Sequence, residues 1–396
     1  MTSTRRFLSI AAVFASAGLA AEAPVDRAWR SLGMGGAGIA VVDDADAVHL
    51  NPAGLTQLGW DKFRPLDSLG YKRDKFDIQV LAVAVDPSPE QLLSLYRFRD
   101  RHRTTIDKAT DEDPLFLVKD QKLLDGLYQF DEKPIRATGT GNVTVAFRNF
   151  GASVWTRDET IVTMDHGAIT PKGLIRLTST SGLELATSQA FVDDRLSLGF
   201  GYRVVAQSVQ QRQYDALELS NEGSESVYRL LRQSGTKLLS TEDWGHGFDV
   251  GALWFQTPAL RFGGSVRDLG MRLDNEFVTP NLTVGLAWAP KVLQSRSLWS
   301  RRVNLGAAFD NLLYDTLGYK PLSKLDLGAE IQQTAIPTFL TVGLSVGLKG
   351  GYPTLGFSTV WFSSLRCDFL TYADETGYFT GDRPNRVWMG RVGVGL

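Results

Sequence analysis

The chain has 396 residues, of which 43% are hydrophobic and 22% are charged, and its formal net charge at pH 7 is −2. This length supports one or two domains with a large apolar core, and the near-neutral charge gives no electrostatic basis for binding nucleic acid. The single cysteine, Cys367, excludes an intramolecular disulfide and a thiolate metal cluster. The four histidines lack the spacing of a metal-binding helix, so we expect no metal and no cofactor.

Residues 1–21 have the pattern of a secretory signal peptide. Arg5 and Arg6 give a basic start, the run from Phe7 to Leu19 is apolar, and small residues follow it as a cleavage site would require. The apolar run is shorter than the about 20 residues that a membrane-spanning helix needs. We therefore predict that the chain is exported.

Residues 22–70 differ in composition from the rest of the chain. They contain the stretch RSLGMGGAGIAVVDDADAVHLNPAGL, at positions 30–55, which packs four glycines into six residues. Glycines let a backbone turn sharply and lie close against a neighbouring surface. Pro52 ends any helix that begins at Asp43 or Asp44. We predict a compact plug that sits against a larger structure.

From about Lys72 onwards the hydrophobic pattern repeats every two residues. Between Leu196 and Val204, every second residue is apolar and the residues between are Ser, Gly or Arg. Alternation of this kind is typical of strands with two different faces. Many segments reach about nine to twelve residues, the length that a tilted strand needs to cross a bilayer. We count fourteen such segments: 72–85, 140–149, 151–163, 173–190, 194–206, 246–256, 259–271, 280–289, 301–312, 323–334, 338–349, 353–363, 364–374 and 385–396.

The connections between these segments alternate in length. Most connections after even-numbered segments are tight turns, whereas most of those after odd-numbered segments are long, above all 86–139 and 207–245. Short turns on one side and long loops on the other are typical of an outer-membrane barrel. We predict an all-β fold in which residues 71–396 form a transmembrane antiparallel β-barrel of about fourteen strands, with both termini on the short-turn side.

The barrel prediction assigns a place to the side chains of each face. Apolar side chains are expected to face lipid, and polar-face charges such as Arg203, Asp249, Asp326 and Glu330 are expected to line a hydrated lumen. Several of the nine tryptophans fall near predicted strand ends, where aromatic girdles form at the membrane interfaces. These tryptophans are Trp155, Trp254, Trp288, Trp361 and Trp388.

Helical patterns occur within the two longest loops. Residues 88–104 and 113–130 place apolar side chains at helical spacing, and in 222–234 a stripe is formed by Val227, Tyr228, Leu230 and Leu231. Such a stripe most often packs on its own protein. At the outer mouth of a barrel it is equally suited to form an apolar entry groove, and the sequence leaves both alternatives open.

Two motif matches lack the structural context of an enzyme. Gly33 to Gly38 fits the dinucleotide-binding pattern G-x-G-x-x-G, but no strand precedes it and no βαβ unit surrounds it. Gly343 to Gly347 fits the nucleophile elbow G-x-S-x-G, but strand alternation runs through it without a break, so Ser345 is expected to face the lumen. We expect no catalytic residues and no enzymatic activity.

The glycine cluster, the acidic-alanine run and Asn51-Pro52-Ala53-Gly54-Leu55 occur in this order behind the predicted signal peptide. This arrangement resembles the N-terminal hatch of the FadL/TodX family of outer-membrane transporters, and equally the opening of PorV-like and TraF-like outer-membrane barrels. The resemblance implies a fourteen-stranded barrel and a hatch that plugs its lumen. It assigns the hatch site to Gly33, Met34, Gly35, Gly36, Gly38, Asn51, Pro52, Gly54 and Leu55, and an external hydrophobic site to the loop with Val227, Tyr228, Leu230 and Leu231.

The resemblance also implies a function and its partners. Passive uptake of hydrophobic small molecules, long-chain fatty acids or hydrocarbons, is the leading hypothesis, with outer-membrane lipids as surroundings. We expect the glycine-rich backbone at 33–38 to move during passage, because few side-chain contacts would hold it. The alternative is a non-transporting barrel that docks or assembles a secretion or conjugation system, because the C-terminal half resembles the PorV-like and TraF-like branch and the loop 86–139 is charged.

Overall fold

The computed structural model describes the following parts of the chain. The described ranges are 28–58, 76–87, 89–104, 122, 125–126, 135–165, 172–215, 243–257, 259–273, 276–294, 301–313, 324–337, 339–362, 365–375 and 384–395. The predicted signal peptide and the predicted external site at Val227, Tyr228, Leu230 and Leu231 lie outside these ranges.

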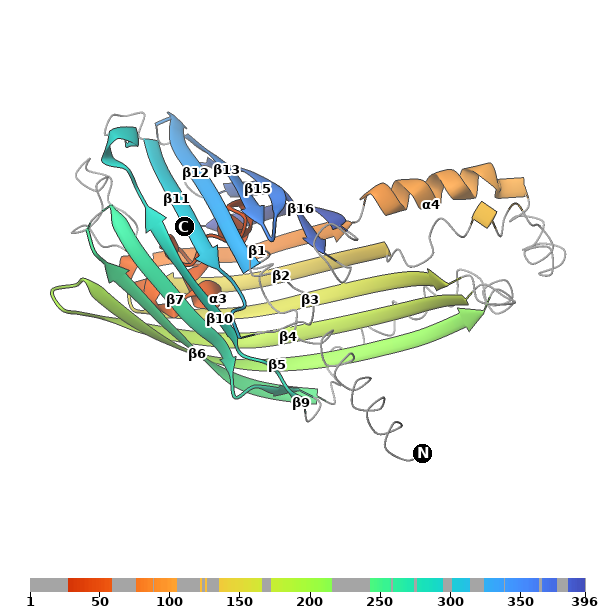
Figure 1. Cartoon of the computed structure of the whole chain (residues 1–396), viewed down its shortest axis with the longest axis horizontal. Helices are drawn as coiled ribbons and strands as arrows, with labels where there is room; N and C mark the ends of the chain where they lie inside the picture. The colour runs from red at the N-terminus through yellow and green to blue at the C-terminus, as the bar shows by residue number, and fades with distance from the viewer. Residues whose placement is uncertain are drawn as a thin grey trace, which may run out of the picture.

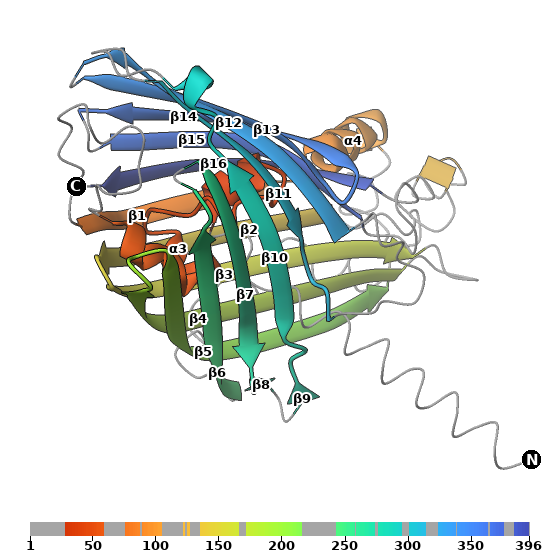
Figure 2. The same cartoon turned by 60° about the vertical axis from the view of Figure 1, so that its left-hand side comes forward.

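Fourteen antiparallel strands form one closed barrel, in which each strand pairs with its neighbours along the chain and β1 pairs with β16 (Figures 1 and 2). A short pair of strands, β8–β9, is inserted between β7 and β10. The barrel strands are β1 Phe76–Pro87, β2 Ile135–Phe147, β3 Phe150–Asp165, β4 Lys172–Phe191, β5 Leu196–Asp215, β6 Asp243–Phe255, β7 Leu260–Leu269, β10 Asn281–Trp288, β11 Arg301–Phe309, β12 Leu325–Ile336, β13 Leu340–Lys349, β14 Tyr352–Trp361, β15 Leu365–Glu375 and β16 Pro384–Gly395. The prediction of an all-β fold with about fourteen strands is confirmed.

Most strand bounds lie within three positions of the predicted ones, and the largest difference is at the end of β5. The sequence predicts that β5 ends at 206, yet it continues to Asp215 and pairs residue by residue with β4 as far as Lys172. Residues 207–215 are mostly polar on both faces, so the alternation vanishes while the backbone ladder continues. As a result β3, β4 and β5 project beyond their neighbours on the long-loop side (Figure 1).

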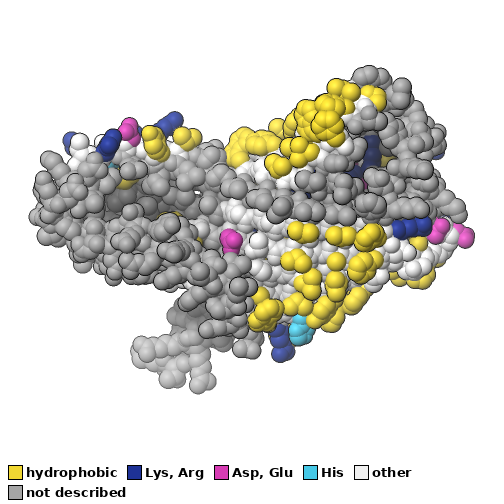
Figure 3. Space-filling model, turned by 180° about the vertical axis from the view of Figure 1, so that it is seen from behind, with side chains coloured by type: hydrophobic (Ala, Val, Ile, Leu, Met, Phe, Trp, Pro, Cys, Tyr) yellow, Lys and Arg dark blue, Asp and Glu magenta, His cyan; other side chains and the backbone are white. Residues whose placement is uncertain are grey.

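The outward faces of the strands carry apolar side chains. Phe200, Val250, Leu286, Leu344 and Phe357, on five different strands, have exposed fractions between 41% and 46%. Rows of hydrophobic side chains lie next to one another on the face seen in Figure 3. A closed barrel with an apolar outer surface suits a lipid environment, because its strands pair with one another around the whole wall and its apolar side chains face outward.

Trp155 does not lie in an interfacial girdle, and this prediction is wrong. Its side chain is 7% exposed and packs with Val205 and Met271, on the same face of β3 as Ser153. Gly182, its partner on β4, has no side chain, and the space this leaves holds the indole ring. The alternation located Trp155 on a strand but could not reveal that a glycine lies opposite it.

Short helices accompany the barrel. In the part of the chain that the structure describes, no helix is long and apolar enough to cross a membrane. Helix α4, Pro89–Arg101, lies within the predicted helical stretch 88–104, follows β1 and lies near β16 (Figure 1). On it Phe98 is buried against His102, whereas Leu93 and Tyr96 are exposed. Three further short helices lie inside the barrel: α2 Trp29–Gly33, α3 Ala47–Leu50 and the 3-10 helix η2 Pro52–Gln57 (Figure 2). The 3-10 helix η5, Lys291–Leu293, follows β10.

Candidate functional site

Residues 28–58, called here the inner segment, lie within the barrel and contact its wall on many sides (Figure 2). The segment comprises α2, α3, η2 and the turns between them. Leu32, Met34, Ile39 and Leu55 have no exposed surface. Together with inward-facing Ala146, Ala186 and Leu253 of the wall, the apolar part of the segment forms the main hydrophobic core of the molecule.

Glycines of the wall make room for the backbone of the inner segment. A Cβ atom on any of them would come within contact distance of the segment, for example of the Ala37 carbonyl at Gly306, of Ile39 at Gly285 and of Ala40 at Gly263. We call this set the glycine ring: Gly151, Gly199, Gly251, Gly263, Gly285, Gly306, Gly328, Gly347 and Gly356. Glycine is needed at such places because any side chain would occupy the space that the other backbone fills.

The inner segment follows the wall from strand to strand. Gly33 lies against β14, Met34 against β12 and β13, Ala37 against β11, Ile39 against β10 and Ala40 against β7. After a turn, Asn51 and Ala53 contact β6 and β5. Because these strands are neighbours in the barrel, the segment runs around the inside of the wall at the level of the glycine ring.

Arg30 forms the first of three ionic anchors between segment and wall. It binds both carboxylate oxygens of Glu330 on β12, one at 2.7 Å, and donates to Asp43 at 2.6 Å within the segment. Arg302 of β11 binds the other oxygen of Asp43. Burial acts to lower the pKa of Arg30, but Coulomb attraction to Glu330 and Asp43 outweighs it and raises the pKa well above its ordinary value. Arg30 therefore stays charged and ties two parts of the segment to the wall.

His49 forms the second anchor. Its Nδ1 atom is bonded to Glu184 on β4, and its Nε2 atom lies 3.3 Å from the Thr144 hydroxyl on β2. The other oxygen of Glu184 binds Arg203 at 2.8 Å. Arg203 in turn binds Asp249 at 2.7 Å and Asp268 at 2.6 Å. All these side chains are buried, so charges of four strands are linked to the segment through one imidazole.

Arg391 of β16 provides the third anchor. Its guanidinium lies 3.9 Å from Asp46 of the segment and 2.7 Å from Asp368 on β15. It also stacks over the ring of Trp29, 4.9 Å from the centroid. The three anchors therefore reach the wall at different strands, the first at β11 and β12, the second at β2 and β4, and the third at β15 and β16. Asp44, the one remaining residue of 28–58 that can carry a charge, pairs with Arg30 at 3.4 Å.

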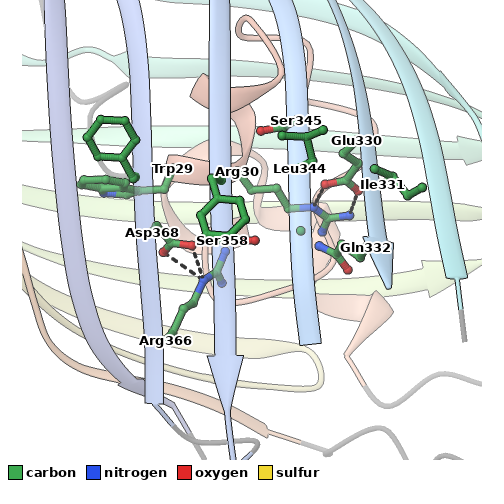
Figure 4. A pocket seen from close by; sticks show the side chains of 13 residues that line it. Trp29, Arg30, Glu330, Ile331, Gln332, Leu344, Ser345, Ser358, Arg366 and Asp368 are labelled. Atoms are coloured by element: carbon green, nitrogen blue, oxygen red, sulfur yellow. Dashed lines mark hydrogen bonds and ion pairs between the residues drawn. The ribbon is translucent and has the colours of Figure 1, made fainter. Parts of the chain in front are cut away.

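A small pocket separates helix α2 from strands β12 to β15 (Figure 4). Its empty space, including the open mouth, is about 370 Å³. The ion pairs Arg30–Glu330 and Arg366–Asp368 line this pocket, together with Trp29, Ser345 and Ser358 (Figure 4). Ser345 thus points to the inside of the barrel, as the strand interpretation of G-x-S-x-G predicts.

The predicted hatch residues all lie in the inner segment. Gly35 and Gly36 have φ angles of 68° and 94°, a left-handed backbone that favours glycine. Asn51 accepts a hydrogen bond from the Ala53 N–H at 3.1 Å and donates to the carbonyls of Ile39 and Ala252, so it caps η2 and joins the segment to β6. The remaining members pack closely: Gly33 against Ser345, Met34 against Gly347, Gly38 against Ser31, Pro52 against Gly251, Gly54 against Val42 and Leu55 against Gly151.

Two expectations about this region are wrong. Arg203, Asp249, Asp326 and Glu330 do not line a hydrated lumen, because each is at most 4% exposed. The backbone at 33–38 is not weakly held: it contacts β11 to β14 directly, and an added Cβ at Gly35 would lie 2.7 Å from backbone atoms of Leu327 and Leu348. The region has few side chains, but its contacts are many, because its backbone packs directly on the backbone of the wall strands.

Sequence reasoning missed the anchors and the glycine ring. Charged residues in an otherwise apolar segment, here Arg30, Asp43, Asp46 and His49, indicate buried partners. Glycines repeated on the polar face of successive strands indicate close approach of another backbone. Both signals are present in the sequence, although neither identifies which residues pair.

No family model matches the chain, and no curated protein matches it. Among solved structures, the chain is similar to the Pseudomonas putida toluene transporter TodX, at 10% identity and a TM-score of 0.43, with 92% of this chain and 96% of that one covered. The CymD monoaromatic hydrocarbon channel is similar at 12% identity and a TM-score of 0.37, covering 92% and 94%. CdiB from Acinetobacter baumannii is similar at 10% identity and a TM-score of 0.36, covering 82% of this chain and 60% of CdiB, so this chain spans about 60% of its length. Similarities at this level carry no argument about what this chain binds.

Proposed function

We propose that this protein is an outer-membrane channel through which hydrophobic small molecules diffuse, and that the inner segment is its plug. The observation that carries the proposal is the combination of an apolar outer wall with a lumen filled by a segment that only non-covalent contacts hold. A barrel that served only as a membrane anchor would not need a separate segment fitted to its wall at nine strands. A reversible closure of the lumen accounts for this fit.

The proposed domain organisation follows from this role. Residues 1–21 would direct export and be removed, residues 22–70 would form the hatch, and 71–396 the barrel in the bacterial outer membrane. Outer-membrane lipids would surround the apolar belt. Because no energy source is needed for movement down a gradient, the channel would work by passive uptake, and the resemblance to FadL/TodX-type hatches favours long-chain fatty acids or hydrocarbons as solutes.

The solute would enter from the long-loop side. There α4 carries the exposed side chains Leu93 and Tyr96, which offer apolar surface on this side. The external site at Val227, Tyr228, Leu230 and Leu231 remains part of this proposal. Passage beyond the glycine ring would require the plug to shift.

A disulfide that locks the plug tests the proposal. A Cβ atom on Gly33 would lie 3.4 Å from the Cβ of Ser345, close to the range of about 3.5–4.5 Å that a disulfide spans. In a background in which Cys367 is replaced by serine, Gly33→Cys with Ser345→Cys would join α2 to β13. Uptake of a fluorescent fatty acid or of toluene into proteoliposomes should be blocked in the oxidised variant and restored by a reductant.

Controls separate this channel from other routes. The Cys367→Ser background should take up solute equally under both redox conditions, and protein-free liposomes give the baseline. Uptake by the unmodified protein that does not exceed this baseline, for any fatty acid or hydrocarbon, would contradict the proposed function.

A second candidate function is a non-transporting barrel that docks a secretion or conjugation partner. The observation that favours it is the number of contacts that hold the inner segment, since a permanently closed lumen needs such contacts most. The two functions are distinguished by purification from native membranes. A partner protein in stoichiometric amount together with absent uptake supports docking, whereas lipid or solute in the lumen supports transport.

A further inference from the structure

One of the three anchors contains a group whose charge changes near neutral pH. The charged groups of the inner segment are Arg30, Asp43, Asp44, Asp46 and, when protonated, His49. Arginine and aspartate ordinarily keep their charge between pH 5 and pH 9, whereas a histidine in water loses its proton at about pH 6.5. Among the residues of the inner segment itself, His49 is therefore the one whose charge ordinarily changes near neutral pH.

The surroundings of His49 favour its charged form. The ion pairs at this anchor bring three carboxylates, Glu184, Asp249 and Asp268, together around the single guanidinium of Arg203. Glu184 lies between that guanidinium and the imidazole and bonds to both. When His49 is neutral, the three carboxylates outnumber the single guanidinium, and this excess of negative charge is costly in a low-dielectric interior. A proton on His49 offsets part of this excess.

Uncharged side chains of β2 and β3 also lie near the ring. Thr144 bonds to the Nε2 atom of His49 and also to Asn142 and Ser153. Helix η2 contributes no charged residue. On α3 itself the N-cap residue Asp46 pairs with Arg391 of β16. Glu184 is thus the ionic partner that His49 meets directly.

We propose that His49 is a proton-operated latch: its imidazolium, paired with Glu184, fastens the α3–η2 half of the inner segment to the wall, and loss of the proton loosens that half. Only the plugged state places the imidazole against Glu184, so the plugged state holds the proton more tightly than a state in which the ring faces water. The latch is therefore complete at acidic pH and weakens as the pH rises through neutrality. The α2 half contains no histidine and is held by Arg30 and by the backbone packing of residues 33–36.

Amide hydrogen exchange in the full-length protein, reconstituted in liposomes, tests the latch without any solute. Protection of residues 47–57 is measured between pH 5.5 and pH 8.5 and corrected for the intrinsic exchange rate at each pH. A one-unit difference in proton affinity between the two states predicts a fall of about tenfold in protection across this range. Protection of strand β15, whose backbone ladder is formed with β14 and β16, serves as an internal reference.

Variants identify the residue responsible. His49→Gln, which retains hydrogen bonding without the charge, should give low protection of 47–57 that changes by less than about twofold with pH, because no group of the pair then titrates in this range. Asp43→Asn is the matched control: it weakens the Arg30 and Arg302 contacts, which hold no group that titrates there, so it should retain the tenfold fall. If His49→Gln fails to assemble, Glu184→Gln removes the negative partner of the latch, so the protection of 47–57 should no longer fall as the pH rises.

The latch is overturned if the unmodified protein shows no pH-dependent protection of 47–57, or if His49→Gln keeps the profile of the unmodified protein. Neither outcome depends on the proposed function, because plug exchange is measured in the absence of solute. Conversely, absent uptake together with a pH-dependent plug would reject the transport role and leave the latch in place.

Discussion

Gly306 illustrates how single residues decide whether the inner segment fits. It lies on β11 beside Gly328 of β12, which in turn lies beside Gly347 of β13, so three neighbouring strands present bare backbone to Met34 and Ala37. A hydrogen atom in place of a side chain on each strand lets the segment approach to van der Waals distance. The residue type matters here for the space it leaves and not for any bond it makes.

Gly306→Ala should therefore unseat the glycine-rich turn without disturbing the barrel. The new methyl group would collide with the Ala37 carbonyl, and overpacking of this kind costs about 1–3 kcal/mol. Exchange protection of residues 33–40 should fall accordingly, while denaturant unfolding of the barrel stays unchanged. Gly390→Ala on β16 is the matched control, because nothing lies within 4 Å of its Cβ position. Equal protection in the two variants would contradict the role of the glycine ring.

Arg30→Ala should weaken the plug more strongly. The substitution leaves the buried carboxylates of Glu330 and Asp43 without their principal cation, and breaking a buried ion pair on one side costs about 3–5 kcal/mol. We expect frequent opening of the channel in planar bilayers and loss of protection over residues 29–46. Arg301→Ala, which removes an exposed arginine bonded to the Leu293 carbonyl, should leave both measurements as they are.

At the scale of elements, the strands β13 and β14 show what an outward face contributes. Leu344 and Phe357 are paired across the two strands and both face away from the inner segment. Trp361 lies at the end of β14, where its indole N–H donates to Thr359 at 3.1 Å. The outward face of β14 is thus apolar in its middle at Phe357, and at its end it carries Trp361, an aromatic residue with a polar N–H group. This arrangement is expected where a strand reaches a membrane interface.

Phe357→Arg should accordingly destabilise the barrel in a depth-dependent way. A charge in the middle of the lipid-facing surface of a transmembrane barrel costs about 2–4 kcal/mol, whereas near the interface the cost falls to about 0–1 kcal/mol. The free energy of unfolding in liposomes, from reversible denaturant titration, should drop for Phe357→Arg and change little for Trp361→Arg. Similar losses for both would mean that this face of β14 does not contact lipid.

The elements were predictable to the extent that their pattern is local. Alternation over ten residues gives β13 its bounds within two positions, since both faces of the strand differ in polarity throughout. The outer half of β5 was missed because its polar residues leave no alternation to detect. The anchors were beyond reach for another reason: His49 and Glu184 are 135 positions apart, and Arg30 and Glu330 are 300 apart, so no local pattern connects them.

For the molecule as a whole, the inner segment lies inside the barrel at the level of the glycine ring. Barrels of 8 strands are filled by their own side chains, whereas barrels of 16 to 18 strands leave an aqueous channel. Fourteen strands lie between these sizes, and in the proposed function the segment closes the space that the wall side chains leave.

Deletion of residues 29–58 should thus yield a permanently open pore. In planar bilayers we expect steady ion conductance, where the intact protein rests at a closed baseline, and the Gly390→Ala variant should behave like the intact protein. A closed baseline after deletion, in a protein whose barrel is shown to be assembled by resistance to protease, would mean that other parts of the chain block the lumen.

The 300 positions that separate Arg30 from Glu330 have a consequence for biogenesis. The seat of α2 is built from β12 to β15, which are among the last strands to be synthesised. Residues 28–58 must consequently wait, with Leu32, Met34 and Ile39 unsheltered, until these late strands have closed the barrel. Contacts so distant along the chain form slowly, so we expect this waiting stretch to be the part of the chain that a chaperone binds most readily.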